Sequence, residues 1–141
     1  MKFLEPASQF LFKCKEGGVI SPQAFRLLVR ELSIEVLRNR HGFTPNKWRK
    51  IASEVLKSDI RISPEAKLLL ERSLKTKENP AVELDHIYTV KEMVAEIKNN
   101  CDSPDSIAQI LLKTKVEILT KEQHRLKTSN SKKSVALGAK C

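Results

Sequence analysis

The feature that most constrains the fold is a helix-start signal, which the chain repeats four times. A hydroxyl residue is followed by proline at Ser21-Pro22, Thr44-Pro45, Ser63-Pro64 and Ser103-Pro104. The hydroxyl can accept a hydrogen bond from the free N–H groups of a first helical turn, and proline at the next position loses no bond. Apolar residues then recur at helical spacing over 22–39 and 45–57, and Gly42 is expected to end the first helix. Further aliphatic runs predict helices around 68–74, 90–97 and 107–111.

Two short segments in the C-terminal half alternate apolar and acidic residues in the manner of strands. They are "AVELDHI" at 81–87 and "KVEIL" at 115–119. Thr120 and Gln123 stand at the spacing of a capping box, so a helix should begin directly after the second strand. We therefore expect an α+β fold that is predominantly helical, with a two-stranded antiparallel sheet in the C-terminal half.

The charge of +9 on 141 residues is unevenly distributed. Residues 1–80 carry 16 Lys and Arg against 9 Asp and Glu, residues 81–120 carry 4 against 7, and residues 121–141 carry 6 against 1. Basic flanks attract a polyanion such as nucleic acid, and an acidic centre between them suits a cation site. An uneven but merely solvated surface is the alternative.

Cysteine usage and hydropathy exclude several classes of protein. Cys14, Cys101 and Cys141 are odd in number and form no CxxC pair, which argues against a disulfide framework and against a zinc knuckle. No segment approaches the roughly 18 uninterrupted apolar residues of a membrane span. We expect a reduced, cytoplasmic setting and no membrane partner.

The two strands and the following helix carry residues that suit phosphodiester hydrolysis. Asp85 and His86 end the first strand, and His124 lies in the first turn of the helix. The motifs "ELDHI" and "TKEQHRLKT" resemble those of the HNH (ββα-metal) endonucleases, and the resemblance covers about residues 80–128. It implies one divalent ion, Mg²⁺ or Mn²⁺ with Zn²⁺ or Ni²⁺ as alternatives, held by Asp85 and His124, with His86 as general base. Glu83 is interpreted as a solvated strand residue.

The chain departs from this family at two points. The usual middle asparagine, shortly before the second strand, is replaced by Lys113, Thr114 and Lys115, which leaves His86 without its usual orienting residue. A helical insertion over 90–114 also takes the place of a short loop.

Three regions follow from these patterns. Residues 1–79 would form a helical region that grips nucleic acid, residues 80–128 the ββα-metal unit, and residues 129–141 a basic tail. DNA is expected as the partner in preference to RNA. The expected contacts with nucleic acid are basic residues near the first helical turn and in the last helix: Arg38, Arg40, Lys47, Arg49, Lys50, Arg125 and Lys127.

A second function stays open at this point. The helices over 22–57 could form a helix-turn-helix that binds nucleic acid without cleaving it, beside a degenerate ββα unit. An inhibitor or assembly factor that binds another protein is a third reading. A two-stranded sheet is marginal by itself, so a homodimer that extends it is considered as well. Metal separates the first two readings, because only the nuclease needs Asp85 and His124 beside one ion.

Overall fold

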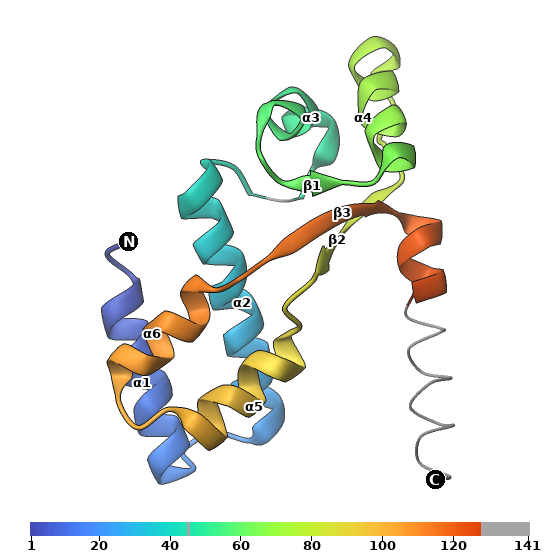
Figure 1. Cartoon of the computed structure of the whole chain (residues 1–141). Helices are drawn as coiled ribbons and strands as arrows, with labels where there is room; N and C mark the ends of the chain where they lie inside the picture. The colour runs from blue at the N-terminus through green and yellow to red at the C-terminus, as the bar shows by residue number, and fades with distance from the viewer. Residues whose placement is uncertain (45, 128–141) are drawn as a thin grey trace, which may run out of the picture. The chain divides into compact units, whose positions relative to one another are not determined.

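The computed structural model describes residues 1–44 and 46–127, which fold into two compact units (Figure 1). The first unit combines Met1–Asn46 with His86–Lys115, and the second combines Lys47–Asp85 with residues 116–127. Helices predominate and a small sheet accompanies them, so the expected α+β class is confirmed. None of the helices within the described ranges is both long and apolar enough to span a bilayer.

The first unit is a group of four helices around an aliphatic core. They are α1 (Leu4–Gly17), α2 (Pro22–His41), α5 (Val90–Asn100) and α6 (Pro104–Leu112). Helix α1 packs against α6, and α2 packs against α5 and α6. The core therefore draws on the expected insertion over 90–114 as much as on the N-terminal helices. Its buried side chains are Leu11, Cys14, Phe25, Val29, Val36, Met93, Ile97, Cys101, Ile107, Ile110 and Leu111.

Three of the four hydroxyl–proline steps start helices as expected. The side chains of Ser21, Ser63 and Ser103 each accept a hydrogen bond from a backbone N–H in the first turn of the helix that follows. Gly42 ends α2 with a φ of 80°, a left-handed conformation that glycine adopts without steric cost.

The fourth predicted start is wrong. Helix α3 begins at Trp48, and its N-cap is Lys47 with a φ of 52° and no side-chain cap. The Asn46 N–H instead donates to the Thr44 carbonyl at 2.7 Å, so the chain turns before the helix begins. Pro45 itself lies outside the described residues.

Helix α1 was not expected from the sequence. Its N-cap is Phe3, which makes no side-chain cap bond, and Glu5 and Lys13 interrupt its apolar pattern. The helix is held by packing, since Leu11 and Cys14 are buried in the core of the first unit. Tertiary contacts thus stabilise α1 in the absence of an N-terminal side-chain cap.

The second unit places a three-stranded sheet beside two helices. Its strands are β1 (Arg61–Ile62), β2 (Val82–His86) and β3 (Val116–Thr120), in the order β1-β3-β2, and residues 121–127 are helical directly after β3. The Lys121 N–H donates to the Ala81 carbonyl at 2.8 Å, as expected for antiparallel β2 and β3. The two helices beside the sheet are α3 (Trp48–Lys57) and α4 (Pro64–Thr76).

The expectation of a two-stranded sheet is corrected by β1. This strand runs parallel to β3, with Arg61 opposite Glu117 and Ile62 opposite Ile118. Two residues are too short a run to show a period in the sequence, so β1 carried no strand signal. The Ser63 N–H extends the pairing by donating to the Ile118 carbonyl at 3.0 Å.

The regions 1–79 and 80–128 were drawn by expected role, and those roles remain predictions. The compact units follow other boundaries, because α5 and α6 of the insertion pack with α1 and α2. The predicted tail over 129–141 lies outside the described residues.

Candidate metal and nucleic-acid sites

The helical segment 121–127 is fixed at its start by the expected capping box. The Thr120 N–H donates to Gln123 Oε1 at 3.0 Å, and the Gln123 N–H donates to Thr120 Oγ1 at 3.0 Å. The Gln123 side chain also accepts from Ser63 Oγ at 2.7 Å and donates to Glu65 Oε2 at 2.9 Å. The Gln123 side chain therefore connects the start of this segment to the start of α4. His124 lies in the first turn of segment 121–127.

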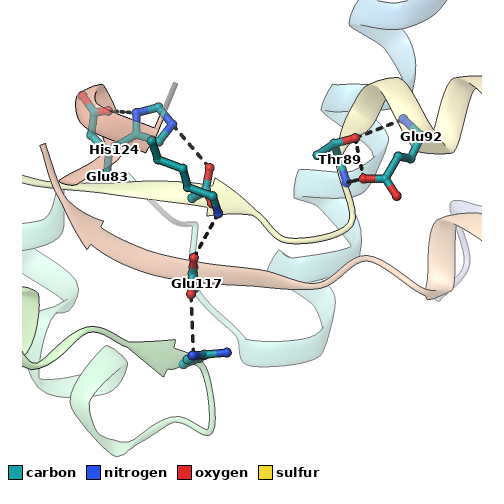
Figure 2. A network of polar contacts seen from close by, with 8 residues as sticks. Glu83, Thr89, Glu92, Glu117 and His124 are labelled. Carbon is teal, nitrogen blue, oxygen red and sulfur yellow. Dashed lines mark hydrogen bonds and ion pairs between the residues drawn. The ribbon is translucent and has the colours of Figure 1, made fainter. Parts of the chain in front are cut away.

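His124 lies between two carboxylates of β2, each facing a different ring nitrogen (Figure 2). Nδ1 is 2.7 Å from Glu83 Oε2, whereas Nε2 is 3.5 Å from Asp85 Oδ1. Residues two apart on a strand point to the same face, which brings both carboxylates to one imidazole. The structure thus places Asp85 and His124 together, as the sequence predicted, and adds Glu83.

Lys127 completes this charged cluster from the end of the same helical segment. Its Nζ is 2.5 Å from Asp85 Oδ2 and 3.2 Å from Glu117 Oε1. The hydrogen bond to Asp85 raises the pKa of Lys127, with a further contribution from Glu117, so the ammonium is held in its charged form. Glu117 also faces Arg61 Nε at 3.6 Å (Figure 2). We call Arg61, Glu83, Asp85, Glu117, His124 and Lys127 the charged cluster.

The Asp85–His124 pair has the spacing of two ligands on one metal ion. Metal–ligand bonds of about 2.1 Å put two donor atoms about 3.4 Å apart at a tetrahedral angle, as for Zn²⁺, and about 3.0 Å apart at the octahedral angle of Mg²⁺. A ligating histidine commonly donates its other ring hydrogen to a carboxylate, the position that Glu83 occupies toward Nδ1 of His124. Within residues 1–44 and 46–127, no group of three or more His, Cys, Asp or Glu side chains is arranged to hold a metal.

His86 has a different environment from its neighbour Asp85. Its Nε2 is 3.0 Å from Ser33 Oγ on α2, and its side chain is half-buried in the first unit. Consecutive strand residues point to opposite faces, which accounts for the different partners of Asp85 and His86.

Three of the basic residues predicted to contact nucleic acid gather at one place in the second unit. Lys47, Arg49 and Lys50, at the start of α3, line a cavity of about 550 Å³ together with Asn79. Among the described residues, none of these three cations forms an ion pair. We call this the basic cavity; it can accept an anion.

The other predicted contacts have different surroundings. Arg40 donates from Nη1 to the Thr114 carbonyl and from Nη2 to the Leu112 carbonyl, both at 2.8 Å, and so caps the end of α6. Arg38 faces Glu35 on its own helix at 3.6 Å. Arg125 is exposed on segment 121–127. Of the two helices in the predicted helix-turn-helix, α2 packs mainly against α5 and α6 within the first unit, and α3 packs against α4 within the second.

Several residues of these sites escaped the sequence reasoning. Glu83 could have been found from its position two residues before Asp85 on the same strand face. Ser33, Glu117 and Asn79 gave no such signal, since each is brought to its partners by tertiary packing.

Comparisons with known proteins add no relative: no family model, no curated protein and no solved structure matches the chain.

Proposed function

We propose that the chain is a metal-dependent endonuclease of the HNH-like type, which hydrolyses phosphodiester bonds in nucleic acid, with DNA as the expected substrate. Support comes from one observation above all: His124 Nε2 lies 3.5 Å from Asp85 Oδ1, while Glu83 engages the opposite ring nitrogen. If Nδ1 donates its hydrogen to Glu83, the lone pair of Nε2 would be left for an ion beside Asp85.

The residues divide the chemistry among them. Asp85 and His124 would hold the ion, Mg²⁺ or Mn²⁺ in the first instance, and Glu83 would orient His124. A bound divalent ion supplies positive charge to the phosphate and to its leaving oxygen. His86 follows Asp85 directly in the chain and would accept the proton of the attacking water, since imidazoles titrate near the working pH of such a reaction.

The basic cavity would bind the substrate backbone. Lys47, Arg49 and Lys50 supply three positive charges around one opening, and phosphate contacts of this kind position nucleic acid without reading its sequence. Such contacts need no metal. Binding and cleavage are therefore separable in this account.

Two substitutions test the assignment because they should fail in different ways. His86→Ala removes the base, so cleavage should fall roughly 10²–10⁴-fold while metal and DNA still bind. His124→Ala removes a ligand, so apparent Mn²⁺ affinity should drop and excess Mn²⁺ should partly restore cleavage. Single-turnover cleavage measured across a Mn²⁺ titration separates the two. Wild-type rates in both variants would refute the assignment.

A second candidate is a nucleic-acid-binding module without catalysis. It is favoured by the Lys127 ammonium, which already lies against Asp85 and Glu117 and neutralises part of the cluster's negative charge. In that case the basic cavity would bind DNA in the presence of chelator, and no divalent ion would produce cleavage. Asp85→Asn would then leave every measured property of the complex with DNA unchanged.

A further inference from the structure

The strand end at His86 is held by two contacts within the first unit. The Ile87 N–H donates to the Lys115 carbonyl at 2.8 Å, which fixes the backbone directly after His86. The ring is held by Ser33, whose Oγ is 3.0 Å from His86 Nε2. Ser33 is fully buried on α2, so its hydroxyl exchanges no hydrogen bonds with solvent.

The single hydroxyl hydrogen of Ser33 determines which ring nitrogen of His86 carries a hydrogen in the contact between them. A serine hydroxyl has one hydrogen to donate and two lone pairs. Ser33 Oγ lies 2.6 Å from the Arg30 carbonyl, an acceptor only, so the hydroxyl hydrogen is directed there. Toward His86 the same oxygen can only accept. The hydrogen in that contact therefore belongs to Nε2 of His86, and Nδ1 is the basic nitrogen of the neutral ring.

The segment that replaces the family's asparagine is engaged elsewhere. The Thr114 hydroxyl donates to the Leu111 carbonyl at 2.6 Å, and the Thr114 carbonyl accepts from Arg40. The Lys115 carbonyl accepts from Ile87. Ser33 on α2, by contrast, contacts the His86 ring directly.

We propose that Ser33 is the positioning residue of His86: from α2 it accepts the Nε2 hydrogen, fixes the tautomer and turns Nδ1 into the nitrogen that takes the water proton. The catalytic part of this inference rests on the proposed function, whereas the Ser33–His86 bond and the tautomer do not. Ser33 on α2 would thus take the orienting role of the asparagine that is missing from the ββα unit.

The bond can be tested in the metal-free, full-length protein by ¹H–¹⁵N spectra of the histidine rings at about pH 8, where imidazoles are mainly neutral. We expect His86 to carry its hydrogen on Nε2 and to exchange it slowly with water. Ser33→Ala should speed this exchange roughly tenfold, the worth of one ordinary hydrogen bond. An Nδ1–H tautomer in the wild type would overturn the inference without any variant.

A matched control comes from Ser73, a buried serine on α4 whose hydroxyl donates to the carbonyl three residues earlier, as Ser33 does, at 2.7 Å. Ser73→Ala should leave both the His86 exchange rate and cleavage unchanged. Ser33→Ala should lower kcat roughly tenfold with KM unaltered, and Ser33→Thr, which keeps the oxygen, should recover most of that decrease.

The outcomes separate this inference from the proposed function. Suppose that the Nε2 hydrogen exchanges slowly and depends on Ser33, but the protein never cleaves DNA. This result would support the Ser33–His86 bond and overturn the catalytic role proposed for Ser33. If Ser33→Ala changes neither cleavage nor the exchange rate of the His86 ring hydrogen, the positioning role of Ser33 is overturned, while the proposed nuclease function is unaffected.

Discussion

The charged cluster and the basic cavity belong to the same unit, but they differ in how their charges are balanced. In the charged cluster the basic side chains lie against carboxylates: Lys127 faces Asp85 and Glu117, Arg61 faces Glu117, and the His124 ring faces Glu83 and Asp85. In the basic cavity Lys47, Arg49 and Lys50 form no ion pair with a carboxylate among the described residues.

This difference indicates what each site requires from outside the chain. Unbalanced cations repel one another, and a bound anion would relieve that repulsion. A balanced cluster already orders its own side chains, so a metal ion would have to join or replace existing contacts. The basic cavity should therefore dominate binding to DNA, and the charged cluster should affect it little.

The largest effect on binding is expected from reversing charge in the basic cavity. Arg49→Glu combined with Lys50→Glu should weaken DNA binding roughly 100-fold for all sequences alike, because phosphate contacts carry no base information. The dependence of log affinity on log salt should become shallower by about 2, because each of the two cations neutralises one phosphate in the wild type. Fluorescence anisotropy in chelator, at several salt concentrations, measures both quantities.

A charge-matched control is available on α4 of the same unit. Lys67→Glu combined with Lys75→Glu makes the same change in net charge at two exposed positions outside the basic cavity. If this control weakens binding as much as the first variant, total charge decides affinity and the basic cavity has no special role.

The next largest effect concerns the carboxylate behind His124. Glu83→Gln keeps the shape of the side chain but removes the charge that holds Nδ1, so apparent Mn²⁺ affinity should fall at least roughly tenfold. Glu122→Gln, at an exposed position of segment 121–127, serves as control. Calorimetry measures the Mn²⁺ affinity of both variants. If Glu83→Gln and Glu122→Gln bind Mn²⁺ equally well, Glu83 is only a solvated strand residue.

A smaller effect is expected from the internal cation of the charged cluster. Lys127→Met frees Asp85 and Glu117, so Mn²⁺ should bind roughly two- to fivefold more tightly, in keeping with the modest strength of an exposed ion pair. Lys121→Met, an exposed lysine on the same segment, should change nothing. Weaker binding in Lys127→Met would mean that the ammonium supports the metal site.

The smallest effect is a pH dependence of stability. Because Asp85 and then Glu117 raise the pKa of Lys127, its contribution to stability is complete below the unfolded value near 10.4 and disappears as pH rises through the higher folded value. Urea unfolding should show the wild type more stable than Lys127→Met by at most about 1 kcal/mol at pH 9. A difference that persists unchanged at about pH 12 would contradict this origin.

Local signals in the sequence predicted local structure well. The serine–proline steps and the capping box of Thr120 and Gln123 place hydrogen bonds within a few residues, and the structure contains them. A second box at Thr89 and Glu92, drawn in Figure 2, has the same signature and begins α5.

Long-range contacts were beyond such reasoning. Ser33 and His86 are 53 positions apart, and no pattern in either segment refers to the other. The pairing of β1 with β3 and the burial of α1 likewise depend on how helices pack, which hydrophobic periodicity leaves undetermined. Asp85 and His124 could be paired from the sequence only by analogy with the strand–strand–helix order of the HNH endonucleases.

The most direct test of the central claim is whether the purified wild-type chain nicks supercoiled plasmid DNA. The account predicts nicked circles with Mg²⁺ or Mn²⁺, no product with excess chelator, and no product from Asp85→Asn, which should bind DNA with wild-type affinity. DNA binding in the absence of cleavage with every divalent ion tested would contradict the nuclease and leave a nucleic-acid-binding module.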